Sequence, residues 1–150
     1  MRVLTMVAAM ALTLGCAGAR QPPPDMSGVD RAITAALGQQ LVGTWELVSS
    51  RVTRGDSVLL DAAAPSLRAY KLINFSHYSV LTVRDGQFMR ASAGRYTLSG
   101  DSYTEIVELA SGAYTPGRAY NFHFRMDGDT WTIDGGSNTE RFVEVWRRVR

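Results

Sequence analysis

Short apolar segments separated by tight turns dominate the chain from residue 41 onward. They are rich in Val, Ile, Thr, Tyr, Phe and Trp, the residues that favour β-strands. Turn-forming residues lie between them at Asp85-Gly86, Ser99-Gly100-Asp101, Asp127-Gly128-Asp129 and Gly135-Gly136-Ser137-Asn138. Because such turns join neighbouring strands into hairpins, the pattern predicts an antiparallel meander.

We expect about ten strands in this region. They cover residues 42–53, 57–60 (the weakest), 69–75, 78–84, 87–92, 94–98, 102–109, 118–126, 130–134 and 141–149. Consecutive short hairpins favour an all-β, closed up-and-down barrel of about 8–10 strands. A two-sheet sandwich is the alternative, but it more often needs a long crossing connection.

Aromatic residues mark where the folding unit begins. All 14 of them lie from Trp45 onward in this chain of 150 residues, and large aromatic side chains supply much of the area that a small core buries.

Before the barrel, Ser27 can cap a short helix over residues 27–38. Its apolar residues recur every four positions and therefore share one face: Val29, Ile33, Leu37 and Leu41. We expect one barrel domain over 27–150.

The first 15 residues have the parts of an export signal peptide. Arg2 precedes an apolar run over residues 3–14, which is too short to span a bilayer, since that needs roughly 20 residues, but suits a signal peptide. The run ends in Thr13-Leu14-Gly15-Cys16, which contains the only cysteine. These four residues resemble a bacterial lipobox, which implies lipid attachment at Cys16. Cleavage after the small residues 17–19 remains the alternative.

Residues 16–26 predict a flexible tether, because they lack apolar periodicity and contain three consecutive prolines that favour extended geometry. Ala17, which follows Cys16, is typical of outer-membrane sorting in lipoproteins of diderm bacteria. We therefore expect a lipid anchor in the cell envelope, on the outer membrane and facing the periplasm. A secreted or periplasmic protein is the alternative.

Composition excludes several classes of function. The net charge is only +2 and the basic residues are scattered, whereas nucleic-acid binding needs a strongly basic face. A single Cys excludes an internal disulfide, and with only His77 and His123 beside it, structural zinc and iron-sulfur sites lack ligands. The sequence contains no phosphate loop and no nucleophile elbow. We expect no metal, no cofactor and no catalytic residue, and both histidines at the surface or rim.

Gly43-Thr44-Trp45, directly after the predicted helix, resembles the opening motif of the lipocalins and the wider calycin barrels. A closer resemblance is to uncharacterised bacterial lipocalin-like domains. It is carried in order by residues 41–49, 94–105, 127–133 and 144–149. The resemblance implies a barrel in which Trp45 closes one end and Arg147 or Arg148 packs over its ring. The bacterial group has no established activity to transfer.

Seven residues are candidates for a ligand site inside the barrel. Five are aromatic and would either line a lumen or fill it: Tyr103, Phe122, Phe124, Trp131 and Trp146. The other two, Glu105 and Glu144, interrupt apolar strands. If they face inward they need partners such as Tyr hydroxyls or Arg148; in the opposite phase they face water.

The leading hypothesis is non-enzymatic binding of a small apolar or amphipathic molecule. It requires a cavity of about 300 Å³ or more. A filled interior would instead favour an accessory module that contacts another envelope protein of unknown identity. A third hypothesis is an isomerase-type enzyme for a lipid-like substrate, which needs Glu105 and Glu144 buried together, because proximity would raise the pKa of one of them.

Overall fold

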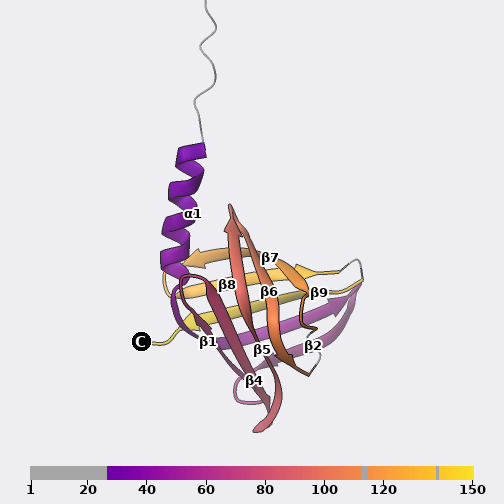
Figure 1. Ribbon diagram of the computed structural model, residues 1–150. Helices are drawn as coiled ribbons and strands as arrows, with labels where there is room; N and C mark the ends of the chain where they lie inside the picture. The colour runs from indigo at the N-terminus through magenta and orange to yellow at the C-terminus, as the bar shows by residue number, and fades with distance from the viewer. Residues whose placement is uncertain (1–26, 113–114, 138) are drawn as a thin grey trace, which may run out of the picture.

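The computed structural model describes residues 27–112, 115–137 and 139–150. The predicted signal peptide, Cys16 and the tether lie outside the described residues. The chain forms one antiparallel sheet in the order β2-β1-β3-β4-β5-β6-β7-β8-β9, and β1 also pairs with β9 (Figure 1). Since β1 pairs with both β3 and β9, eight strands form a closed ring. The all-β, up-and-down barrel with a short N-terminal helix is confirmed.

The elements follow the predicted turns closely. They are α1 (Ser27–Leu41), β1 (Gly43–Arg54), β2 (Ser57–Ala63), β3 (Leu67–Ile73), β4 (His77–Arg84), β5 (Gln87–Ser99), β6 (Ser102–Ser111), β7 (Ala119–Asp127), β8 (Thr130–Gly136) and β9 (Arg141–Arg148). The helix ends at Leu41 rather than at residue 38.

One strand prediction was wrong. The segments expected as two strands, 87–92 and 94–98, form the single strand β5. The ladder between β5 and β6 shifts its register between Ala93 and Gly94, so a β-bulge accommodates the break in the sequence pattern. A Cβ at Gly94 would overlap the carbonyl oxygen of Ile106 on the neighbouring strand. Glycine is therefore required for the close approach of the two strands.

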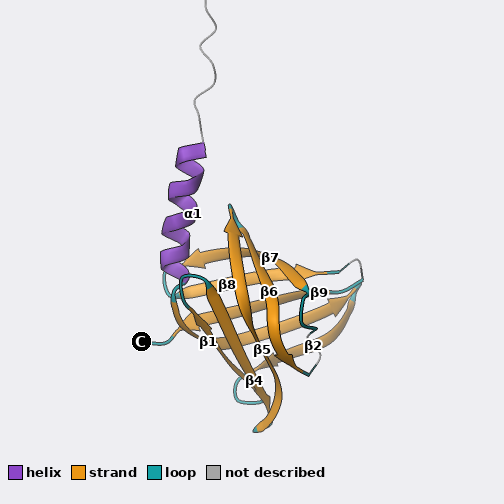
Figure 2. Cartoon of the chain, viewed as in Figure 1, coloured by secondary structure: helices purple, strands orange, loops and turns teal. Residues whose placement is uncertain are grey.

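Strand β1 closes the barrel because it has two different partners along one edge. Its first residues, Gly43 to Glu46, pair with β3, and its second half, from Ser49 to Arg54, pairs with β2. The other edge of β1 pairs with β9. The β1–β2 hairpin and the β4–β5 hairpin reach away from α1 (Figure 2), so the barrel has one end beside the helix and one end remote from it.

Aromatic side chains fill the end beside the helix. Trp45, Trp131 and Tyr103 are fully buried, and the Trp131 ring lies 5.5 Å from Trp45 and 5.3 Å from Tyr103 in edge-to-face contacts, a favourable arrangement of rings. From α1, Leu41 is buried and Leu37 is partly buried against this core.

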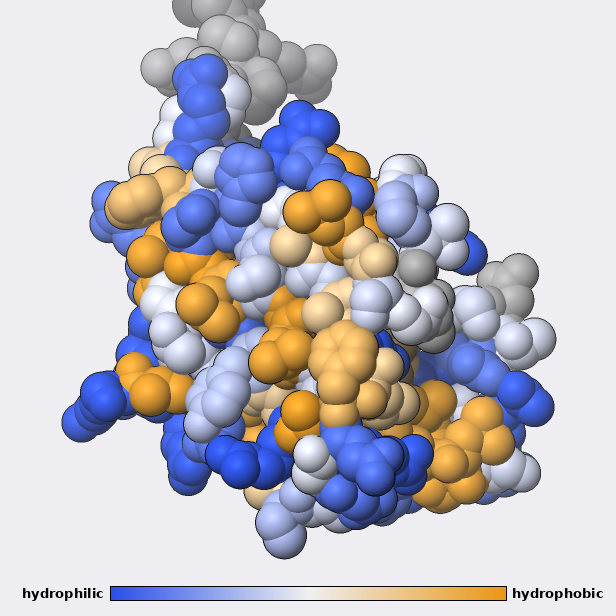
Figure 3. Space-filling view, turned by 60° about the horizontal axis from the view of Figure 1, so that its bottom comes forward, coloured by the Kyte–Doolittle hydropathy of each residue, from blue (hydrophilic) through white to orange (hydrophobic). Residues whose placement is uncertain are grey.

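The rest of the apolar face of α1 is exposed. Val29 and Ile33 are not covered by the barrel, since only the C-terminal half of the helix packs against it (Figure 2). Within the described ranges, no helix is long and apolar enough to cross a membrane. The outer surface mixes apolar and charged side chains, as one face of the molecule shows (Figure 3).

Candidate functional site

A cavity of about 500 Å³ occupies the half of the barrel remote from α1. This volume lies within the range of small-molecule sites. The cavity lining is mixed, with polar and charged side chains beside apolar ones. The apolar side chains come from seven of the strands: Val52, Leu60, Leu67, Met89, Phe122, Ile133 and Phe142. The barrel is thus neither solid nor hollow throughout. It is filled with aromatic rings beside the helix and open at the other end.

An ion pair between Lys71 and Glu105 forms part of the cavity floor. The Lys71 Nζ atom donates a hydrogen bond to Glu105 Oε1 at 2.7 Å, and the two side chains are only 4% and 5% exposed. The Tyr103 hydroxyl donates to the same carboxylate oxygen at 3.0 Å. The carboxylate therefore has two donors, as a buried charge requires. Burial and the neighbouring Glu105 charge raise the pKa of Tyr103 well above its usual range, which keeps the hydroxyl protonated as a donor.

Three aromatic rings surround the ammonium group of Lys71. Its Nζ atom lies 5.0 Å from the ring centroid of Trp146, 5.1 Å from that of Trp131 and 5.7 Å from that of Tyr103. Each distance is within the range of cation–π attraction. The rings beneath the cavity thus stabilise the positive charge above them.

Glu144 is the second carboxyl group of the floor. It is half-buried, and its Oε2 atom accepts a hydrogen bond from Trp146 Nε1 at 3.2 Å. Burial raises the pKa of Glu144, and the nearby Glu105 charge adds to the increase, while Lys71 and Arg90 partly oppose it. Glu144 therefore protonates more readily than an ordinary glutamate.

The sequence left open whether Glu105 and Glu144 face the interior or the solvent, and the structure answers this question. Both Glu105 and Glu144 face inward and line the cavity. Arg148 is not the partner of either carboxylate, because its guanidinium lies at the opposite end of the barrel, over Trp45. Lys71 and Tyr103 are the partners of Glu105 instead.

The aromatic candidates divide into two groups. Phe122 lines the cavity, in edge-to-face contact with Phe142 at 5.3 Å. The other four belong to the packed core and do not line the cavity: Tyr103, Phe124, Trp131 and Trp146. Both interpretations of the aromatic residues thus apply, each to a different half of the barrel.

Arg148 contacts both the Trp45 ring and the end of α1 at the filled end of the barrel. Its guanidinium carbon lies 4.3 Å from the Trp45 ring centroid. Nη1 donates to the carbonyl oxygen of Val42 at 2.8 Å, and Nη2 donates to that of Gln40, so this side chain also satisfies carbonyls at the C-terminal end of α1. Arg147 points outward and pairs with Glu46.

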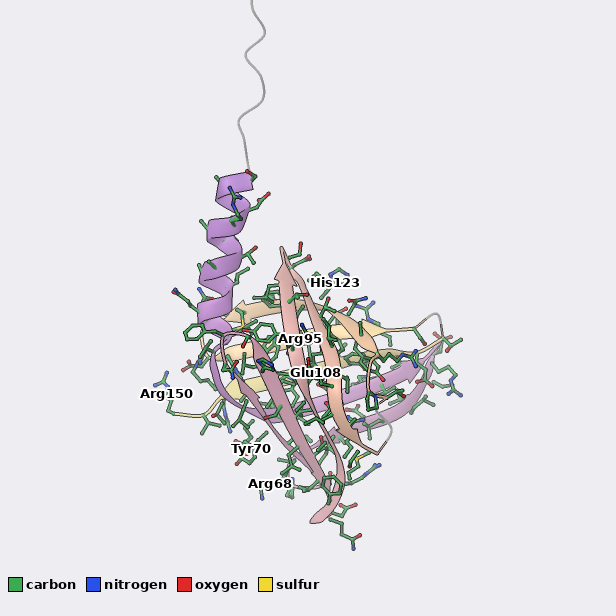
Figure 4. All side chains as sticks on the ribbon, viewed as in Figure 1. Arg68, Tyr70, Arg95, Glu108, His123 and Arg150 are labelled. Carbon is green, nitrogen blue, oxygen red and sulfur yellow. The ribbon has the colours of Figure 1, made fainter. Side chains whose placement is uncertain are left out.

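The sequence did not predict Lys71 as a site residue, and the residue pattern of β3 explains why. On β3, Leu67, Ala69, Lys71 and Ile73 face the interior and alternate with exposed residues. The exposed set includes Tyr70 and Leu72, of which Tyr70 is drawn on the outside of β3 (Figure 4). Because both faces of this strand carry large apolar residues, alternation alone could not assign the lysine to the inside.

The two histidines lie outside the cavity. His77 is at the start of β4, where its Nδ1 atom is 2.7 Å from Ser76 Oγ. His123 is exposed, with its Nδ1 atom 3.5 Å from Asp101. Among the described residues, no group of three or more His, Cys, Asp or Glu side chains could hold a metal ion.

Comparison with solved structures finds a distant structural likeness. No family model matches the chain, and no curated protein matches it. A solved structure described as "REP1-NXSQ fatty acid transporter" is 12% identical, with a TM-score of 0.42, over 75% of this chain and 98% of that one. A likeness this weak carries no argument about function. The closed antiparallel barrel itself fits the calycin-like architecture that the sequence motifs implied.

Proposed function

We propose that the barrel binds a small hydrophobic or amphipathic molecule and does not transform it. The observation that carries the proposal is the cavity of about 500 Å³ inside the closed barrel, which exceeds the volume that the hypothesis required. The apolar side chains in its lining can bury an apolar body, with a gain of about 25 cal/mol for each Å² of apolar surface removed from water. The polar floor can fix the orientation of a head group.

A solid-core accessory module is less well supported, because half of the interior is open. An isomerase-type enzyme remains a second candidate. It is favoured by one observation: Glu105 and Glu144 face the same cavity, and the pKa of Glu144 is raised by burial. Such an enzyme would lose turnover, and not binding, when Glu144 is replaced by glutamine.

The proposal includes an anchor in the cell envelope. Its support is the sequence alone: an apolar leader, the lipobox-like residues 13–16 and a proline-containing tether over 16–26. The barrel would then stand on the outer membrane and face the periplasm. Mass spectrometry of the mature chain should find added acyl groups at Cys16, and Cys16→Ala should release the protein from membranes. A soluble, unmodified chain that begins at Arg20 would contradict the anchor.

Native mass spectrometry of the protein purified from its own host tests the binding role. We expect a species heavier than the chain, whose additional mass is released as one small molecule on denaturation. A native species from which denaturation releases no small molecule would contradict the proposal.

A further inference from the structure

Ionisable side chains from four strands form the floor of the cavity. Lys71 on β3, Arg90 on β5 and Glu144 on β9 line both the large cavity and a much smaller one beneath it. Glu105 on β6 lines the large cavity beside them. The rest of the lining mixes apolar side chains, among them Leu60, Phe122 and Phe142, with the charged side chains of Arg84, Arg118 and Glu140. We expect an amphipathic molecule to place its polar head against the floor, where Lys71 and Glu105 are buried, and its apolar part against the apolar side chains.

The charges of the cavity favour an anionic head. Its lining contains four cationic side chains, namely Lys71, Arg84, Arg90 and Arg118, and three carboxyl groups, namely Glu105, Glu140 and Glu144. Glu140 also pairs with Arg54 outside the lining. Arginine keeps its charge at any physiological pH, whereas a carboxyl group can become neutral. With all of these groups ionised the lining has a net charge of +1, and protonation of Glu144 raises it to +2, which attracts an anion more strongly.

Glu144 faces the charged groups that control its protonation. The positive charges of Lys71 on β3 and Arg90 on β5 lower the pKa of Glu144, and the charge of Glu105 on β6 raises it. Trp146 on its own strand donates a hydrogen bond to it. Its cross-strand neighbours, Ser50 on β1 and Ile133 on β8, carry no charge. An anion placed at this floor is repelled by an ionised Glu144 but can accept a hydrogen bond from the protonated form.

We propose that the cavity binds a singly charged amphipathic acid head first, beside Lys71 and Arg90, and that Glu144 takes up one proton as the acid enters. The inference rests on the proposed binding function and names its ligand class. The proton comes from solvent and bonds to a carboxylate oxygen of Glu144. The resulting neutral carboxyl group donates its O–H to the anionic head, and the charge of the ligand itself does not change.

The test uses three probes with the same alkyl tail: dodecanoate, dodecan-1-ol and dodecylammonium. Their affinities for the full chain are measured by calorimetry between about pH 6 and pH 8, where the charges of the carboxylate and the amine do not change. We expect dodecanoate to bind at least about tenfold more tightly than the other two at the lower pH. Its affinity should fall as the pH rises, by up to about tenfold per pH unit for one coupled proton.

Two variants test whether Glu144 is the group that takes up the proton. Glu144→Gln should retain dodecanoate binding and lose its pH dependence. Glu108→Gln is the matched control, because Glu108 pairs with Arg95 on the outer face of β6 and β5 (Figure 4), and it should keep the wild-type pH dependence. Binding of dodecylammonium that is tightest of the three and is lost in Glu144→Gln would overturn the proposal, as would pH-independent dodecanoate binding in the wild type.

The outcomes separate this inference from the binding function. If dodecan-1-ol binds as tightly as dodecanoate, the barrel still binds amphipathic molecules and the acid selectivity is wrong. If none of the three probes binds, the proposed binding function itself fails.

Discussion

The ammonium group of Lys71 and the carboxylate of Glu105 meet inside the barrel at 2.7 Å, directly above the ring of Trp146, which lies 5.0 Å from the same nitrogen. Burying two charges is costly unless the pair is well bonded. Here the hydroxyl of Tyr103 and three aromatic rings add to the attraction. The pair lies between the packed half of the barrel and the open half, where it forms part of the floor of the cavity, and we expect it to contribute to the stability of the fold.

Removal of Lys71 should be severely destabilising. Lys71→Met leaves Glu105 buried without its cation, and we expect the free energy of unfolding to fall by about 3–5 kcal/mol. The double variant Lys71→Met, Glu105→Gln should recover part of this loss, because no uncompensated charge remains. Urea denaturation of the wild type, Lys71→Met, Glu105→Gln and the double variant gives the coupling energy.

The exposed pair of Arg95 and Glu108 provides the control for this measurement. Arg95→Met should cost no more than about 1 kcal/mol, since exposed ion pairs contribute little. A loss in Lys71→Met as small as that in Arg95→Met would show that the interior pair does not stabilise the fold.

Glu144→Gln should become more stable than the wild type as the pH rises. Burial raises the pKa of Glu144 in the folded protein above its ordinary value of 4.5, so folding favours the protonated form. The stability that this group contributes is complete below its unfolded pKa and is lost as the pH rises through the folded pKa. Glutamine does not titrate, so the advantage of the variant should grow from about pH 4 toward pH 8.

Thermal unfolding across this pH range checks the prediction for Glu144. Glu108→Gln, on the outer face, should show no such growing advantage. If Glu144→Gln and the wild type keep a constant difference in stability at every pH, the carboxyl group does not titrate as described.

Arg148 should matter for the attachment of α1. Arg148→Met removes the contact with the Trp45 ring and the hydrogen bonds to Val42 and Gln40. The contact with the ring alone is worth about 0.5–2 kcal/mol, so we expect a total loss of about 1–3 kcal/mol. Relative to the wild type, the increase in amide hydrogen exchange of Arg148→Met should be largest in the last turn of α1. Arg147→Met, which affects only an exposed pair with Glu46, should leave both quantities nearly unchanged.

The sequence predicted the architecture well, because turn residues and strand-forming residues are local signals. It placed the barrel-closing pair at Trp45 with Arg147 or Arg148, and the structure brings Arg148 over the ring. It could not predict Lys71, because Tyr70 and Leu72 make the outer face of β3 as apolar as the inner one. It also left the phase of Glu105 and Glu144 open, since both faces of β9 are apolar, with Phe142 and Trp146 on one and Val143 and Val145 on the other.

The cavity could not be predicted from composition. Aromatic residues are as compatible with a filled barrel as with a lined one, and the difference depends on how side chains from non-adjacent strands pack. Trp131 and Trp146 pack against each other beneath the floor, with tilted rings whose centroids are 6.3 Å apart, whereas Phe122 and Phe142 line the cavity above it. Only the strand register decides which ring enters which half.

Binding of the neutral fluorescent probe N-phenyl-1-naphthylamine to two matched variants tests the central claim most directly. Val52 lines the cavity, and Val48 is exposed on the outside of the same strand. Val52→Trp fills part of the cavity, so we expect it to weaken probe binding by about tenfold or more, which corresponds to about 1.4 kcal/mol. Val48→Trp should bind the probe as the wild type does. Equal binding by the wild type and a correctly folded Val52→Trp would contradict a ligand site inside this barrel.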